Sequence, residues 1–244
     1  MRGGAPVLLI ACGALAREIT AVLRAARLEH MSVECLPAKL HNTPALITEA
    51  VRAKIRKGRA RFARIFVLYG DCGTGGALDA MLAEEGVERI QGAHCYEFFA
   101  GPPRFAELSE EEPCSFYLTD FLVRHFERLV IEGLGIDRHP ELLPLYFGNY
   151  KRLVYLAQVR SPELEEAARA AAARLGLAFE LRATGYGDLE RALMSVDERE
   201  RTPADVSPPL LRATPDVMEA SPSPCPLPRR GGEGCVGLAR RSRA

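Results

Sequence analysis

The sequence predicts an α/β fold: a three-layer, mostly parallel, doubly wound (Rossmann-like) sheet with a helical insertion. Short apolar runs of strand type alternate along the chain with longer segments whose apolar residues recur at helical spacing. Several of these runs end in polar or glycine-rich turns, which is where a parallel sheet carries its binding site. Alternation and turn chemistry together favour this class over an all-helical or all-strand fold.

The composition is ordinary for a globular protein and excludes several functional classes. A chain of 244 residues can bury a substantial core, and its 32 basic and 32 acidic residues leave no net charge to attract nucleic acid or an anionic membrane. Its apolar runs are too short to span a bilayer, and the first one continues into an amphipathic helix, unlike a signal peptide. We therefore expect a cytoplasmic protein whose seven cysteines are reduced.

Two strands and two helices are expected before residue 60, from apolar periodicity. Thr43 is expected to cap the second helix, with Pro44 at its first position. The elements are a strand at 7–11, a helix at 15–28, a strand at 31–36 and a helix that ends near residue 57.

The central unit is an apolar strand at 65–69, a glycine-rich turn at 70–76 and a helix at 77–85. A short strand then ends in the polar turn 91–97. The block 102–150 interrupts the alternation and is expected to be a helical insertion that caps the strand ends.

The last elements complete one α/β domain over residues 1–200. Ser161 and Pro162 are typical of a helix start, and Gly176 of a helix end. The Pro/Gly/Arg-rich segment 201–244 cannot bury enough apolar area to offset the cost of ordering, so we expect a disordered tail. The elements are a strand at 152–158, a helix to Leu175, a strand at 178–182 and a helix at 189–193.

Cysteines and histidines follow several of the predicted strands. Because parallel strand ends meet at one edge, these side chains are expected to converge, and thiolate and imidazole ligands suit Zn²⁺ or another soft metal. The alternative is that the cysteines pack as small hydrophobic residues. Cys35 is expected in the core, and Cys114 is a further candidate ligand. The predicted ligands are Cys12, His41, Cys72, His94 and Cys95.

Carboxylates and glycines in the same turns suggest further roles. Asp71 and Glu97 are candidate acid–base groups or supports of the site, although Asp71 would equally serve as a helix cap. ATP and NAD are not expected, because neither the P-loop lysine nor a three-glycine dinucleotide motif is present. The glycine turns are expected to hold an anionic part of a substrate through Gly73, Thr74, Gly75, Gly185 and Gly187. Asp188, in the second turn, is a further expected binding residue and, like Asp71 and Glu97, a candidate acid–base or supporting group.

The chain resembles an uncharacterised prokaryotic family, domain of unknown function 1638 (DUF1638). The resemblance covers roughly residues 7–195 and implies no settled activity, but it places the cysteines and histidines at motif positions of the family. It also implies a link to corrinoid-dependent methyltransferases and one-carbon metabolism. The matching stretches are Ala11-Cys12-Gly13-Ala14-Leu15, Leu40-His41-Asn42-Thr43-Pro44, Tyr69-Gly70-Asp71-Cys72-Gly73, His94-Cys95-Tyr96-Glu97, Phe116-Tyr117-Leu118-Thr119-Asp120-Phe121 and Thr184-Gly185-Tyr186-Gly187-Asp188-Leu189.

These observations lead to one main functional prediction and two alternatives. The main prediction is a cytoplasmic metalloprotein, an enzyme that acts on a small-molecule ligand, with zinc as the expected metal. An alternative is a non-catalytic protein that carries a small molecule, a metal or a corrinoid to a partner enzyme. A third reading has a pocket without a metal. An open coordination position would favour the enzyme, and a saturated four-ligand site the carrier.

Overall fold

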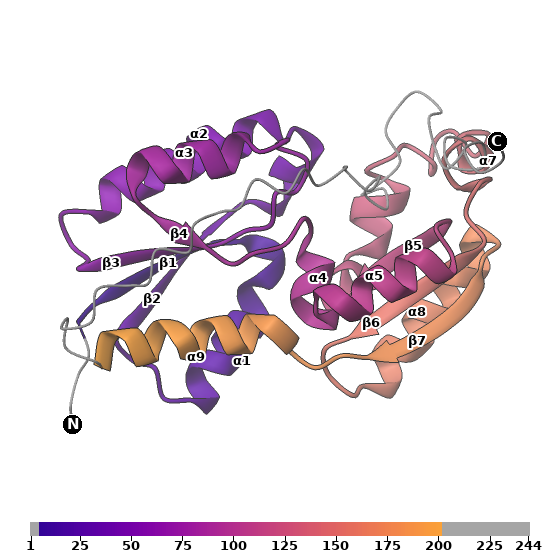
Figure 1. The fold of residues 1–244 in the computed structure, drawn as a ribbon. Helices are drawn as coiled ribbons and strands as arrows, with labels where there is room; N and C mark the ends of the chain where they lie inside the picture. The colour runs from indigo at the N-terminus through magenta and orange to yellow at the C-terminus, as the bar shows by residue number, and fades with distance from the viewer. Residues whose placement is uncertain (1–4, 202–244) are drawn as a thin grey trace, which may run out of the picture.

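A computed structural model describes residues 5–201, and its first half forms a four-stranded parallel sheet (Figure 1). The strand order is β2-β1-β3-β4, so the chain moves outward from β1 to one side of the sheet and then to the other. β1 is entirely buried and lies at the centre of the largest apolar core. The strands are β1 (Val7–Cys12), β2 (Met31–Leu36), β3 (Arg64–Leu68) and β4 (Glu88–Arg89).

Helices cover both faces of this sheet, which gives the predicted three layers. Helices α2 and α3 pack together on one face, and α1 and α9 on the other (Figure 1). The predicted cap of α2 is wrong, because its first residue is Ala45 and Thr43 makes no capping bond. The helices are α1 (Ala16–Ala25), α2 (Ala45–Gly58), α3 (Ala77–Glu85) and α9 (Gly187–Arg201), with short 3₁₀ turns at Gly13–Leu15 and Ala38–Asn42.

The remaining strands form a second parallel sheet, in the order β5-β6-β7. Because β5 lies inside the block 102–150, the expectation of a purely helical insertion is wrong. β5 is buried on both faces, so its sequence is a nearly continuous apolar run. The spacing of apolar residues in such a run does not distinguish a buried strand from a buried helix. A single domain over 1–200 remains a prediction. The strands are β5 (Ser115–Thr119), β6 (Arg152–Ala157) and β7 (Ala178–Ala183).

The second sheet also lies between helices. Phe116 and Leu118 face a core shared with α8, whereas Tyr117 faces α5. As predicted, Ser161 caps α8, accepting the Leu164 N–H, and Gly176 ends it with a left-handed backbone. The helices are α4 (Cys95–Ala100), α5 (Pro102–Glu111), α6 (Asp120–Arg124), α7 (Leu142–Phe147) and α8 (Pro162–Leu175), with a π-helical turn at Glu127–Ile131.

Helix α9 connects the two sheets, because the chain leaves β7 in the second unit and returns to the first (Figure 1). It packs against α4 and α1. At its start, Gly187 lies so close to the end of α4 that an added Cβ would overlap the carbonyl oxygen of Phe99. This position requires glycine for reasons of packing.

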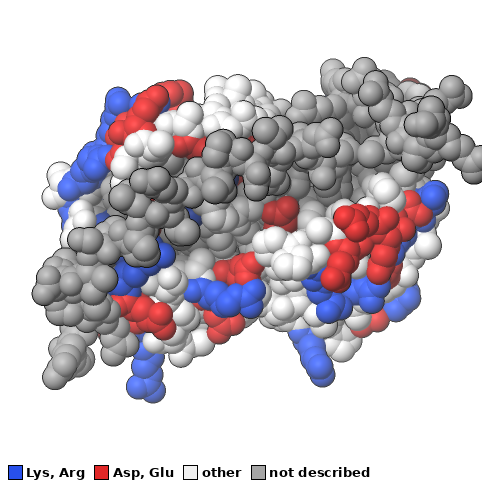
Figure 2. All heavy atoms as spheres, viewed as in Figure 1, with Lys and Arg blue, Asp and Glu red and all other residues white. Residues whose placement is uncertain are grey.

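The distribution of surface charge and the polarity of the helices are relevant to what the protein can bind. On the face shown in Figure 2, acidic and basic side chains of the described residues lie interspersed. Within residues 5–201, no helix combines the length and the apolar character that a membrane span requires. The predicted tail falls at 202–244, outside the described residues.

Glu18 of α1 is a buried carboxyl group, 5% exposed, and its Oε2 has no hydrogen-bond partner among the described residues. Burial raises its pKa, and the charge of Asp120 adds to this effect. An acid with a raised folded-state pKa stabilises the fold least once pH exceeds that pKa. The free energy of unfolding should therefore fall as pH rises from the pKa of this carboxyl in the unfolded chain, ~4.3, to its raised pKa in the folded protein.

We expect Glu18→Gln to remove this component of the pH dependence. Urea midpoints should match those of the wild type near pH 4 and exceed them near pH 7, because the amide carries no charge to bury. Glu29→Gln, at an exposed position, is the control and should leave the pH profile unchanged. Parallel profiles for wild type and Glu18→Gln would contradict the prediction.

Candidate metal centre

Four loops at the carboxyl edge of the first sheet carry the candidate ligands. Cys12 ends β1, His41 lies in the 3₁₀ turn after β2, Cys72 follows β3, and Cys95 begins α4 after β4. β2 lies on one side of β1 and β3 on the other, so the order in which strands are added to the sheet reverses between β1 and β3. Loops diverge at such a switch point, which is where open α/β sheets bind ligands. The sequence predicts that these residues gather at one edge, and His41, Cys72 and Cys95 do, with one ligand atom of each within 4.8 Å of the others.

The loops after β3 and β4 are paired through their backbones. The Asp71 N–H donates to the Gly92 carbonyl at 3.1 Å, and the Cys72 N–H donates to the Ala93 carbonyl at 2.8 Å. Gly70 allows this approach, because an added Cβ there would lie 3.1 Å from the Ala93 oxygen. The pairing brings a residue after β3 beside the first residue of α4.

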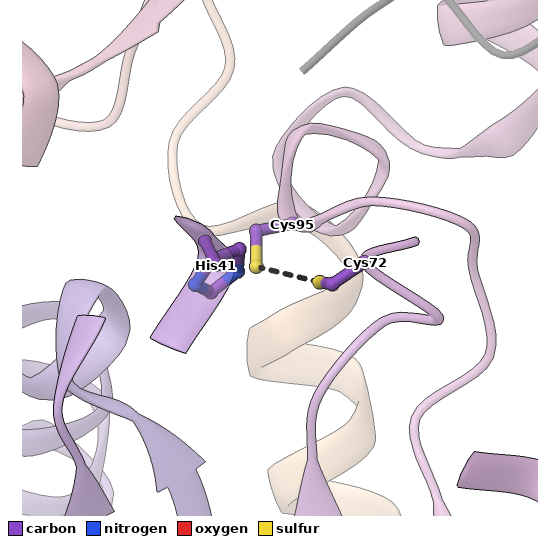
Figure 3. Close-up of side chains that lie close together, drawn as sticks. All are labelled: His41, Cys72 and Cys95. Atoms are coloured by element: carbon purple, nitrogen blue, oxygen red, sulfur yellow. Dashed lines mark hydrogen bonds between the residues drawn. The ribbon is translucent and has the colours of Figure 1, made fainter. Parts of the chain in front are cut away.

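This pairing places the sulfur atoms of Cys72 and Cys95 4.0 Å apart (Figure 3). The distance is about twice the length of a disulfide bond, so the thiols are free. Cys72 has a φ of 50°, a left-handed conformation that non-glycine residues adopt at an energetic cost. Such strain is found where the surroundings hold a functional side chain in place.

His41 approaches the thiol pair from the other half of the sheet. Its Nδ1 lies 3.0 Å from the Ala38 carbonyl oxygen, and its ring stacks on Tyr69 with centroids 6.0 Å apart. A carbonyl oxygen only accepts, so Nδ1 donates in that contact, and a metal-bound His41 would use the lone pair of Nε2. The sulfur of Cys12 lies 3.8 Å from the same Nδ1.

Together, His41, Cys72 and Cys95 have the geometry of a metal site. One ligand atom from each lies within 4.8 Å of the others, and Figure 3 shows the three side chains converging from separate segments. With metal–sulfur bonds of ~2.3 Å, two sulfur ligands at tetrahedral angles are about 3.8 Å apart. The observed 4.0 Å between the two sulfur atoms is close to that separation.

The charges within the cluster are strongly linked. Burial lowers the pKa of His41, but the sulfur atoms of Cys12 and Cys72 outweigh it and raise the pKa to about 11. The Cys95 thiol, followed by His41, holds the pKa of Cys72 well below its usual range. The neighbouring Cys72 sulfur and burial raise the pKa of Cys95. Without a metal, these shifts favour a Cys72 thiolate beside a protonated His41, and a bound metal would displace the protons of its ligands.

The other two predicted ligands lie beside the cluster. Cys12 is fully buried and its sulfur accepts the Ala14 N–H at 3.4 Å, so it contacts His41 without joining the three-residue group. His94 is also outside that group, and burial lowers its pKa, which keeps its ring neutral. Its Nε2 has no hydrogen-bond partner among the described residues.

Asp71 and Glu97 support the loops that carry the cysteines. Asp71 accepts hydrogen bonds from the Thr74 hydroxyl at 2.5 Å and from two turn N–H groups, and Glu97 accepts the Ala93 N–H at 2.6 Å. These bonds outweigh burial and lower the pKa of Asp71. Both carboxylates thus hold backbone next to the cluster, which is the supporting role that the sequence allowed. An acid–base role stays a prediction.

Only the second of the two glycine turns remains available as the expected anion site. In the first, the N–H groups of Gly75 and Gly76 already donate to Asp71, which leaves them unavailable to a ligand. The same carboxylate bonds Thr74, and Gly73 is part of this closed turn. The Asp71 carboxylate accepts the N–H groups that we expected a bound anion to occupy.

The second turn has a different environment. Gly185 and Gly187 line an open cavity of about 640 Å³ beside Glu190 and Arg191. Asp188 is outside this lining and forms an ion pair with Arg191. This turn lies at the start of α9, and the structure does not bring it into the Cys/His cluster.

Two more cysteines differ from expectation. Cys35 is exposed on edge strand β2, so its assignment to the core is wrong. Cys114 precedes β5 at the amino end of the second sheet, whereas the cluster lies at a carboxyl end of the first. Arg89, which contacts the loops of the site, was not predicted, because an arginine beside a short strand has no distinguishing sequence signal.

The fold and the cluster define an α/β protein of two parallel sheets with a possible Cys₂His metal site at a strand edge. The chain belongs to the family "Protein of unknown function (DUF1638)", whose model matches residues 35–193. The match confirms the resemblance and includes His41, Cys72 and Cys95, whereas Cys12 precedes it.

The other comparisons add little. No curated protein matches the sequence. Among solved structures, ornithine carbamoyltransferase from Pyrococcus furiosus is similar over 73% of this chain and 54% of its own, with 12% identity and a TM-score of 0.22. The chain thus spans about half the length of that enzyme, and a likeness of this size carries no argument about function.

Proposed function

We propose that this protein binds a soft divalent metal through His41, Cys72 and Cys95, with zinc as the first candidate. The bound metal would act on a small-molecule ligand. The carrying observation is the 4.8 Å convergence of one nitrogen and two sulfur atoms, with the sulfurs at a tetrahedral separation. Three protein ligands and one open position are typical of catalytic zinc sites.

The residues around the cluster support a bound ligand. The Tyr69 hydroxyl is buried and has no hydrogen-bond partner among the described residues. Burial and the nearby Cys12 sulfur raise its pKa, so it remains a protonated donor. A ligand at the open position would give this hydroxyl a stronger acceptor than the neighbouring Cys12 sulfur, which is a weak one.

A metal at this position would supply Lewis-acid activation of a water, a thiol or a methyl donor. His41 would be held in its ligating tautomer by the Ala38 carbonyl. For the reaction class we propose one-carbon or methyl-transfer chemistry linked to corrinoid enzymes in the cytoplasm, on the basis of the family resemblance alone. The thiolate-rich donor set is compatible with it.

The carrier function remains the second candidate, because of one contact. The sulfur of Cys12 lies 3.8 Å from His41 Nδ1, the nitrogen that faces the Ala38 carbonyl, so Cys12 would become a fourth protein ligand if the His41 ring turned and presented Nδ1 to the metal. Four protein ligands would close the site and leave no position for a substrate. The number of sulfur ligands therefore distinguishes the two functions.

We expect purified, untagged protein to contain about one equivalent of zinc, iron or cobalt, measured by plasma mass spectrometry. Thiol titration before and after chelation should release two cysteines of the seven if the site is open, and three if Cys12 is a ligand. Reconstitution with Zn²⁺ under reducing conditions controls for metal lost in purification. Failure to bind zinc in reduced, folded protein would overturn the proposal.

A further inference from the structure

We propose that Arg89 is a positioning residue of the metal centre, which sets the separation of the Cys72 and Cys95 sulfur atoms through the backbones of their loops. The proposal rests on the proposed metal site. Arg89 ends the two-residue strand β4 and contacts none of the ligands, but its guanidinium group joins both loops that carry them.

One side of the guanidinium is anchored to helix α3. Nε donates to Asp79 Oδ1 at 2.5 Å and Nη2 donates to Oδ2 at 2.8 Å, a bidentate pair. Asp79 lies in the first turn of α3, directly after the glycine turn that follows Cys72. The arginine side chain is 6% exposed, so its donors depend on protein acceptors.

The other side binds the two cysteine loops. Nη1 lies 2.8 Å from the Ile90 carbonyl oxygen, 3.1 Å from that of Gly92 and 3.4 Å from that of Tyr69. Tyr69 is three residues before Cys72, and Gly92 is three residues before Cys95. The Gly92 oxygen also accepts the Asp71 N–H, so the guanidinium strengthens the backbone pairing that brings the thiols together.

The chemistry of arginine is needed for this arrangement. A planar guanidinium can hold a carboxylate bidentately on one side and donate to carbonyl oxygens on the other. A lysine ammonium is a single point of charge and cannot span Asp79 and the three carbonyls together. Groups that hydrogen-bond directly to metal ligands typically change metal affinity by roughly 10–100-fold when they are replaced. Arg89 acts one step further out, on the backbones of the ligand loops, so its replacement should fall at the lower end of that range.

The test uses Arg89→Lys and, as a second variant, Asp79→Asn, which removes only the half-exposed anchor. Zinc affinity is measured by competition with a chromogenic chelator, and the geometry by the absorption bands of the Co²⁺-loaded protein. Arg152→Lys is the matched control: Arg152 is 16% exposed and donates to Ser115, Glu180 and the Leu108 carbonyl, away from the site. Circular dichroism and thermal melting verify folding.

We expect Arg89→Lys to lower zinc affinity roughly 10-fold and to alter the Co²⁺ bands, with Asp79→Asn shifted in the same direction. Arg152→Lys should keep wild-type affinity and bands. Unchanged affinity and bands in folded Arg89→Lys, or equal losses in Arg89→Lys and Arg152→Lys, would overturn the proposal.

A metal-free readout separates this proposal from the metal function. Dibromobimane bridges two close thiols, so it should link Cys72 and Cys95 in the metal-free wild type and do so more slowly in Arg89→Lys. If the wild type binds no zinc but this difference appears, the metal function fails and the positioning role stands. Equal bridging rates would overturn the positioning role.

Discussion

Cys72→Ser is expected to abolish stoichiometric metal binding. In the proposed site Cys72 supplies one of the two sulfur ligands, and its neighbours hold the pKa of its thiol well below the usual range, which favours the metal-binding thiolate. A serine hydroxyl stays protonated at neutral pH and is a poor ligand for a soft metal. The loss of affinity should exceed the roughly 100-fold typical of an outer-sphere replacement, as measured by metal content and chelator competition.

Cys114→Ser is the matched control for this prediction. Cys114 is also a free, partly buried thiol, but it lies before β5 in the second sheet. Cys35→Ser is a second control: it removes an exposed thiol on β2 and should affect neither metal content nor stability appreciably. If Cys72→Ser retained as much zinc as Cys114→Ser, the assignment of the site would be wrong.

Gly187→Ala is expected to have the largest effect on stability. The added Cβ would overlap the Phe99 carbonyl oxygen and lie 2.6 Å from that of Phe98, and neither backbone atom can move aside easily. The φ of 50° at Gly187 adds the left-handed penalty of an L-residue. Overpacking and backbone strain together should cost about 2–5 kcal/mol, measured by urea unfolding.

Gly185→Ala separates these two effects. Gly185 has a similar φ of 62°, but nothing lies within 4 Å of an added Cβ. It should therefore cost only the backbone penalty, about 1–2 kcal/mol. Equal losses at the two positions would show that the approach of α9 to α4 is not a tight packing contact.

Helix α4 links the Gly187 contact to the candidate metal site, because α4 begins at Cys95 and packs against α9. Displacing the end of α4 would move the helix whose first residue is one of the two proposed sulfur ligands. We therefore regard α9 as the element through which the second sheet, from which the chain enters α9, is connected to the site on the first.

Local sequence determined most of the individual elements. The helix at 77–85 has the predicted bounds, because Gly76 and Gly86 both adopt left-handed conformations that end regular structure. Ser161 and Gly176 delimit α8 for equally local reasons. The convergence of His41, Cys72 and Cys95 was also predictable, since parallel strands bring their carboxyl ends to one edge.

Tertiary structure alone decided how the strands divide into two sheets. β5 is apolar on both faces, a pattern that fits a buried strand or a buried helix, and only its pairing with β6 resolves the choice. It also decided which polar groups are free for a ligand. The sequence could not show that Asp71 occupies the N–H groups of the glycine turn, or that Arg89 reaches across both cysteine loops. Such contacts join loops whose approach depends on packing of the whole sheet, whereas the strand, turn and helix signals arise within a few residues.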